Sequence, residues 1–194
     1  MGVVSPIISF DDGKLAGPWA SRFGGGMRAV VQRVSFATVT VDGADGSEVV
    51  GSIGPGLLLL VCAMEGDTDE DVAWLVQKVP QLRIFADADG RMNLSLLQRE
   101  PGERGLLVVS QFTLSADLGP GLTKGNRPSF TAAMAPGPAA VVIDHLMERL
   151  REGGCTVAGG RFGASMRVRL ENDGPVTLWL DTRVGRTGGV SPSV

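Results

Sequence analysis

The sequence predicts an α+β domain in which a mainly antiparallel sheet curls into a barrel-like layer and carries two principal helices. Short segments rich in β-branched and apolar residues alternate with Gly-, Pro- and Asp-rich turns, which indicates about eight strands. Two longer segments have apolar residues at helical spacing. The connections between the first strands are very short, and short connections favour antiparallel neighbours.

The first three strands are expected at 27–43, 48–53 and 57–64, because Asp-Gly and Gly-Pro-Gly turns separate these apolar, β-branched runs. A helix is expected to begin at 67–70, where capping and acidic residues cluster, and to end or kink at Pro80. The remaining expected elements are a strand, turn and strand within 82–96, a strand at 105–114, a long loop at 115–131, a helix from Pro136 to Gly153, and strands at 155–158, 166–171 and 176–181.

Composition describes a soluble globular protein of one domain: the chain has 194 residues, of which 43% are hydrophobic and 20% charged. No apolar run approaches the ~20 residues of a membrane span. The net charge is −3 and the pI is near 5.2, which argues against a protein that wraps nucleic acid. This charge still permits a few local arginines to hold a short RNA end.

Three segments are expected from changes in composition. Residues 1–26 read as a flexible or partly docked extension, because they lack a basic signal-peptide start and end in three glycines. Residues 27–182 form the patterned domain. Residues 183–194 are small and polar, so we expect a disordered tail.

The cysteines and the single histidine exclude several kinds of site. Cys62 and Cys155 have no CxxC spacing, so neither a disulfide framework nor a zinc site is expected, and the predicted location is the reducing cytoplasm. His145 falls in the middle of a predicted helix beside its apolar stripe, where a half-buried structural role is the better interpretation. We therefore expect neither a metal nor another cofactor, and no Ser-His or Cys-His catalytic pair.

Polar residues end one otherwise apolar strand, at the segment SQFTL (110–114). Buried polar groups cost free energy unless they are hydrogen-bonded or used. Such a strand end either emerges into solvent or presents N–H groups that form an oxyanion hole. The residues alone leave both interpretations open.

The segment 171–181, ENDGPVTLWLD, contains a second unusual feature. Gly174 reaches backbone angles closed to other residues and Pro175 fixes its own φ, so the pair forms rigid backbone with carbonyl groups in set directions. An ordinary hairpin turn between two strands is the alternative.

Six motifs together resemble one family. They are MRAVVQRVSFATVTVDG, RIFADADGRMNLSL, VVSQFTL, KGNRPSF, GRFGASM and NDGPVTLWLD, in that order from Met27 to about Asp181. In this combination they resemble D-aminoacyl-tRNA deacylase of the bacterial and eukaryotic type. The resemblance implies a homodimer that hydrolyses the ester linking a D-amino acid, or mischarged glycine, to the 3′-terminal ribose of tRNA.

The resemblance also implies roles for individual residues. Gly174 and Pro175 would form a cis peptide that enters the partner subunit's site, held by Arg33. The reaction centre would be lined by residues of the SQFTL segment, namely Ser110, Gln111, Phe112 and Thr113. The RNA's own 2′-OH would assist the reaction, which agrees with the lack of a base to activate the Thr113 hydroxyl. Thr113 is therefore expected to orient groups rather than to attack.

Chirality would be selected by exclusion, because rigid Gly-Pro carbonyls accept the Cα–H of a D-residue but collide with an L side chain. Lys124, Arg127 and Arg161 are expected phosphate contacts. The chain departs from the family pattern at 44–47 and 119–122, where loops are longer. Two alternatives are a non-catalytic module that binds tRNA ends or accompanies a synthetase, and a small structural dimer.

Overall fold

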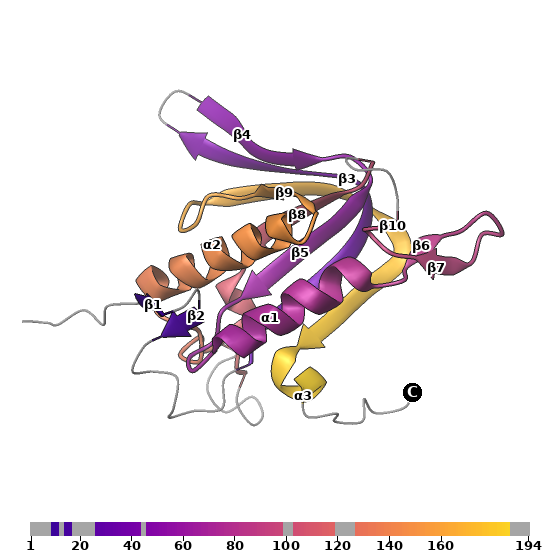
Figure 1. Ribbon diagram of the computed structural model, residues 1–194. Coiled ribbons are helices and arrows are strands. Elements are labelled where there is room, and N and C mark those ends of the chain that lie inside the picture. Colours follow the sequence, from indigo (N-terminus) through magenta and orange to yellow (C-terminus); the bar gives the residue numbers. More distant parts are fainter. Residues whose placement is uncertain are drawn as a thin grey trace, which may run out of the picture.

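The computed structural model describes residues 9–11, 14–16, 26–43, 46–98, 103–118 and 127–186, the first two segments by backbone alone. A six-stranded sheet has the order β10-β3-β5-β8-β9, and β4 also pairs with β3 (Figure 1). Its strands are β3 (Arg28–Gly43), β4 (Gly46–Ile53), β5 (Gly56–Cys62), β8 (Gly105–Ser110), β9 (Thr156–Gly159) and β10 (Met166–Asp181).

Strand β3 organises the sheet because it pairs along both of its edges. One edge pairs with β10 from Arg28 to Val41. The other edge pairs first with β5, up to Val34, and then with β4, from Ala37 onward. A sheet in which one long strand changes partner in this way curls. Its far margins meet where β4 approaches β9, as a Cβ placed on Gly51 would lie only 2.4 Å from the Gly159 carbonyl oxygen.

The prediction of a mainly antiparallel sheet is correct only for part of the sheet. β3 is antiparallel to β4, β5 and β10, as expected. The β5–β8 and β8–β9 pairs are parallel instead. Helices α1 (Asp69–Lys78) and α2 (Pro136–Glu152) lie in the chain between these pairs, and a parallel pair requires such a long crossover.

Both principal helices begin and end for local reasons that the sequence indicates. Thr68 and Asp71 form a capping box at the start of α1, and Pro80 lies in the 3₁₀ turn η1 (Val79–Gln81) that ends it. Gly153 caps α2. The helices cross the same face of β5 and β8 (Figure 1). The predicted buried stripe of α2 is confirmed, and its members are Ala139, Val142, Ile143, Leu146 and Leu150.

Two apolar clusters lie on the two faces of the central strands. Leu57, Leu59 and Val61 pack under the helices, whereas Leu58 packs with Val39 on the opposite face, inside the curl. The uninterrupted apolar run of β5 is therefore explained by burial on both faces.

The smaller elements differ in part from the expectations. β6 (Phe85–Ala86) and β7 (Met92–Leu94) form the hairpin expected within 82–96. Helix α3 (Thr182–Arg186) shows that 183–186 are ordered rather than part of a disordered tail, because Thr182 hydrogen-bonds to Asp71 and α3 packs on α1. Residues 187–194 lie outside the described residues.

Only short backbone segments of the predicted extension are described. β1 (Ser9–Asp11) pairs antiparallel with β2 (Lys14–Ala16), and the character of the rest of 1–26 stays a prediction. Among the described residues, no helix is both long and apolar enough to cross a membrane.

Substituting Gly51 by alanine should destabilise the domain, because the new Cβ would collide with the Gly159 backbone where β4 meets β9. We expect a loss of about 1–3 kcal/mol in the free energy of unfolding, measured by urea denaturation. Gly137→Ala is the matched control, since a Cβ on Gly137 meets nothing within 4 Å. Equal stability of the two variants would contradict the proposed close approach of β4 and β9.

Candidate functional site

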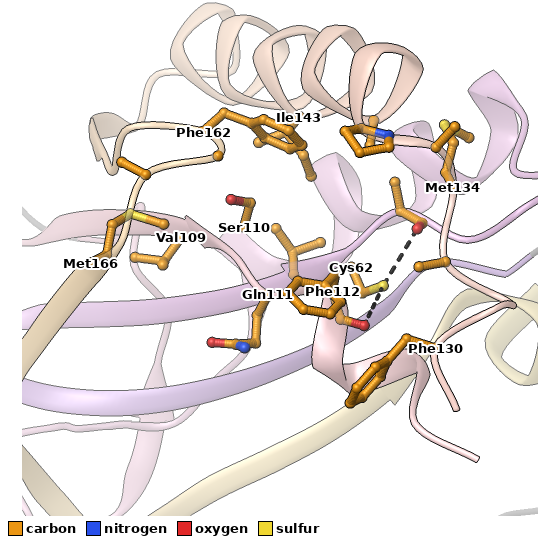
Figure 2. Close-up of a pocket in the computed structure, with 18 of the residues that line it drawn as sticks. Cys62, Val109, Ser110, Gln111, Phe112, Phe130, Met134, Ile143, Phe162 and Met166 are labelled. Carbon is orange, nitrogen blue, oxygen red and sulfur yellow. Dashed lines mark hydrogen bonds between the residues drawn. The ribbon is translucent and has the colours of Figure 1, made fainter. Parts of the chain in front are cut away.

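A cavity of about 570 Å³ opens where β5 and β8 end (Figure 2). The start of α2 and the segment that follows β9 complete its walls. Most of its lining is apolar, with the Ser110 hydroxyl and the Gln111 amide as the polar side chains. The residues that line it include Cys62, Ser110, Gln111, Phe112, Phe130, Met134, Ile143 and Phe162.

The polar wall of the cavity arises where β8 leaves the sheet. The Gln111 backbone N–H donates to the Val61 carbonyl oxygen at 2.8 Å, and the chain then turns into the 3₁₀ helix η2 (Phe112–Ser115). The strand predicted at 105–114 therefore ends at Ser110, earlier than expected. This turn carries Gln111 and Phe112 to the cavity instead of continuing along the sheet edge.

Three of the four residues predicted at the reaction centre line the cavity: Ser110, Gln111 and Phe112. Thr113 is exposed on η2 beside them, and its hydroxyl accepts a hydrogen bond from the Gln111 side-chain amide. Thr113 thus does not line the cavity itself but contacts Gln111, which does. Its role in orienting the groups at the reaction centre stays a prediction.

Cys62 lies at the cavity wall beneath Phe112, and its thiol contacts the Ala63 and Phe112 carbonyl oxygens at 3.4 and 3.6 Å (Figure 2). Burial, reinforced by the negative charge of Asp67, raises the thiol pKa from its ordinary value of 9.0 to about 11. A protonated thiol is a poor nucleophile, so this cysteine is unsuited to covalent catalysis at neutral pH.

His145 has the structural role expected of it. Its Nε2 atom lies 3.1 Å from Asp69 Oδ1, and Arg149 Nη1 donates to the same oxygen at 3.1 Å. This cluster joins α2 to α1 and is separate from the residues that line the cavity.

Aromatic side chains border the cavity. Phe112 is 59% exposed and meets Phe130 edge-on, with ring centroids 5.2 Å apart. Phe162 lies on the opposite side, near Ile143 (Figure 2). Phe130 and Phe162 were not predicted as site residues, although they belong to the KGNRPSF and GRFGASM motifs. Distant segments supply them, so sequence spacing gives no signal that they converge.

The Gly174-Pro175 pair lies at a different place, in the middle of β10. Its peptide bond is cis. It does not form the hairpin turn considered as an alternative, because both flanks of the pair run antiparallel to the same strand, β3. Asn172 is opposite Val34 and Thr177 is opposite Gln32, so the residues between them, exposed except for Val176, form a bulge opposite Arg33.

Arg33 holds the residue that precedes Gly174 in this bulge. Its Nε donates to the Asp173 carbonyl oxygen at 3.0 Å and lies 2.8 Å from the Asp173 carboxylate. The guanidinium also donates to the Ile84 carbonyl oxygen, and the side chain is only 12% exposed. The contact is with the residue before Gly174, and the functional role of this grip stays a prediction.

Within one chain, the bulge and the cavity lie at different places on the sheet. Gly174 lies level with Arg33, which pairs with Leu57, whereas Ser110 lies level with Val61. Four residues along the strands and three strand spacings across them give a path of about 20 Å along the sheet, from ~3.3 Å per residue and ~4.8 Å per strand. One chain therefore does not bring the two predicted halves of the site together.

The predicted phosphate contacts have different surroundings. Arg161, next to Phe162, pairs with Glu48 at 2.8 Å, and both side chains are exposed. Arg127 is exposed. Lys124 and the longer loop at 119–122 lie outside the described residues, so all three contacts stay predictions.

In the part of the chain that the structure describes, no group of His, Cys, Asp and Glu could hold a metal ion.

The thiol chemistry of Cys62 can be tested directly. At pH 8 we expect iodoacetamide to modify Cys62 about 100-fold more slowly in the native protein than in urea, because a pKa raised by about two pH units lowers the thiolate fraction by that factor. In the native protein the rate should rise about tenfold with each pH unit and level off only above about pH 11. Mass spectrometry of the labelled peptides measures it, and equal rates in both states would contradict the burial described.

Comparisons with known proteins show the family to which the chain belongs. A family model described as D-Tyr-tRNA(Tyr) deacylase matches residues 30–181. The D-aminoacyl-tRNA deacylase of Dinoroseobacter shibae is 52% identical over 155 residues, covering 80% of this chain and 99% of the relative. That of Myxococcus xanthus is 53% identical over 156 residues, covering 80% and 95%.

Two solved structures are also similar. The c-Myc DNA Unwinding Element Binding Protein superposes with a TM-score of 0.67 at 36% identity, covering 79% of this chain and 97% of that one. A probable eukaryotic D-amino acid tRNA deacylase gives a TM-score of 0.64 at 21% identity, covering 80% and 99%, which supports the fold alone.

Proposed function

Because the chain belongs to the D-aminoacyl-tRNA deacylase family, we propose that it hydrolyses the ester between a D-amino acid, or glycine, and the 3′-terminal ribose of tRNA. The observation that carries this proposal is the cavity at the ends of β5 and β8. Its walls combine the Ser110–Phe112 segment with an aromatic border. Cytoplasmic location is part of the proposal, since tRNA is the substrate.

The cavity suits the end of a tRNA in size and lining. A volume of about 570 Å³ lies within the usual range of small-molecule pockets. Phe112, Phe130 and Phe162 offer faces on which an unstacked base can lie. Only this end of the tRNA needs to be held, so the acidic pI of the whole chain presents no obstacle. Arg127, Arg161 and Lys124 would contact the adjacent phosphates.

The chemistry proposed for the cavity is electrostatic stabilisation and positioning. A helical turn leaves its first backbone N–H groups without partners inside the turn, and in η2 these belong to Phe112 and Thr113. They are suited to stabilise the oxyanion that forms when the ester carbonyl is attacked. An aminoacyl ester is already activated, so this stabilisation and correct orientation can suffice.

The RNA itself would supply the assisting hydroxyl. The Cys62 thiol is protonated at neutral pH, and the Thr113 hydroxyl is engaged by Gln111. His145 is bound to Asp69 between the helices. Since none of these groups is placed as an activated nucleophile, we assign that role to the neighbouring 2′-OH of the terminal ribose, with Thr113 orienting Gln111.

A second copy of the chain would complete the site. Gly174 and Pro175 are exposed and lie about 20 Å along the sheet from the cavity of their own chain. A homodimer that inserts this bulge into the partner subunit's cavity would join the two halves. The carbonyl groups there would leave room for the Cα–H of a D-residue or glycine and would collide with an L side chain.

The sheet face opposite the helices is the surface that we assign to this dimer. Trp179, Val30 and Leu60 stand in one row across β10, β3 and β5, and Trp179 is 55% exposed. Neighbouring Leu178 and Leu180 point the other way and pack under the helices. Trp179 of this row lies on β10, the strand that carries the bulge, so a copy seated on the row would be close to Gly174 and Pro175.

The activity is tested by incubating the protein with D-tyrosyl-, L-tyrosyl- and glycyl-tRNA and measuring the release of amino acid. We expect rapid release of the D-amino acid and of glycine, and L-tyrosine release at the uncatalysed rate. Gly174→Ala should slow D-tyrosine release by about 100-fold, because a Cβ there would lie 2.9 Å from Asn172 Oδ1 and displace the bulge.

Gly54→Ala is the matched control, since a Cβ on Gly54 meets nothing within 4 Å. Equal release of the D- and L-amino acids by the wild-type protein would reject the proposed activity. Binding of tRNA without turnover would favour a non-catalytic tRNA-end-binding module instead.

The dimer surface is tested by Trp179→Glu. A carboxylate in the apolar row should prevent association, so sedimentation velocity should show a monomer, and release of D-tyrosine should fall with it because the site is incomplete. Met92→Glu is the control, because Met92 is 62% exposed on the β6–β7 hairpin, away from this row. A fully active dimeric Trp179→Glu variant would show that the interface lies elsewhere.

A further inference from the structure

The bulge in β10 interrupts the strand ladder at the residues that present Gly174 and Pro175. Pairing stops at Asn172, opposite Val34, and resumes at Thr177, opposite Gln32. Four residues of β10 therefore face one residue of β3, so the ordinary ladder cannot satisfy or position their backbone groups. Side chains must therefore supply the missing hydrogen bonds if this segment is to keep a single conformation.

The side-chain amide of Asn172 supplies two of these missing bonds. Its Nδ2 atom donates to the Arg33 carbonyl oxygen at 2.9 Å and to the Val176 carbonyl oxygen at 3.1 Å. The first acceptor is on β3 and the second is beyond the Gly-Pro pair. Both N–H groups of the amide are thus used, and they tie the two sides of the bulge together.

The same amide also lies against Gly174. A Cβ built on Gly174 would be 2.9 Å from Asn172 Oδ1, closer than real Cβ contacts. The amide therefore fixes the far side of the bulge while Arg33 fixes Asp173 on the near side. Gly174 and Pro175 project between these two anchors and remain exposed.

We propose that Asn172 is a positioning residue that sets the discrimination between D- and L-aminoacyl-tRNA. This inference rests on the proposed function, in which the Gly-Pro carbonyls exclude L side chains. Steric exclusion fails if the excluding carbonyl groups can move away from the substrate by up to about 1 Å. The hydrogen bonds of Asn172 oppose that movement beside Gly174, although this side chain would not touch the reacting atoms.

A purely structural role predicts a different result. Asn172 is exposed, and its bonds surround a surface bulge rather than the core, so its loss should leave the fold and the partner contact in place. A loosened bulge would admit L-aminoacyl esters and hold D-aminoacyl esters less well. General destabilisation would instead lower both rates by the same factor.

The experiment compares Asn172→Ala and Asn172→Asp with the wild-type protein. The first variant removes the amide, and the second keeps its size but replaces the donor by an oxygen that faces two carbonyl groups. For each, kcat/KM is measured on D-tyrosyl- and L-tyrosyl-tRNA, together with the melting temperature and the sedimentation coefficient. Glu171→Gln is the matched control on the preceding residue, whose carboxylate contacts only Ser35 among the hydrogen bonds described.

We expect the ratio of D to L rates to fall by about tenfold or more in both variants, since two ordinary hydrogen bonds are lost. L-tyrosine release should rise above the uncatalysed rate, while Glu171→Gln keeps the wild-type ratio. If one variant does not fold, the other decides.

An unchanged ratio, an equal loss of both rates, or failure of both variants to fold would overturn the inference. Wild-type protein that does not discriminate between D- and L-tyrosyl-tRNA would overturn the proposed function itself, and this outcome is distinguishable from the others.

Discussion

The change of partner along one edge of β3 is the constraint on which the rest of the structure depends. Pairing with β5 ends at Val34 and pairing with β4 begins at Ala37. On the opposite edge, the ladder with β10 breaks opposite Arg33, one residue before the pairing with β5 ends. The strand whose change of partner curls the sheet therefore also lies opposite the bulge that carries Gly174 and Pro175.

The cavity needs a different feature of the same sheet. Its polar wall requires strands that end without turning back, and the parallel strands β5 and β8 end together at Cys62 and Ser110. A rigid Gly-Pro unit instead requires support from a continuous ladder on both sides, which β3 gives to β10. In one chain, the strand ends that form the cavity and the paired strand that supports the Gly-Pro unit lie at different places on the sheet. Under the proposed function, a twofold arrangement of two chains resolves this separation.

Local chemistry made much of the fold predictable. The capping box at Thr68, the break at Pro80 and the apolar stripe of α2 depend on neighbours within a few residues, and the structure has all three. The direction of β8 was not predictable in the same way. Its apolar run signals burial on both faces, but the partner strand is chosen by tertiary contacts, here through a crossover helix.

The candidate site shows the same division between local and distant information. Ser110 and Gln111 stand out because polar residues at the end of an apolar strand are a local anomaly. Phe112 was implied only by the family resemblance, and Phe130 and Phe162 come from separate segments. Asn-Asp-Gly-Pro has the same local preferences in a hairpin turn as in a bulge. What decides between them is that both flanks pair with β3. The role of the Asn172 amide could not be predicted for the same reason. Its two acceptors, the Arg33 and Val176 carbonyl oxygens, come within reach of one side chain because the bulge forms.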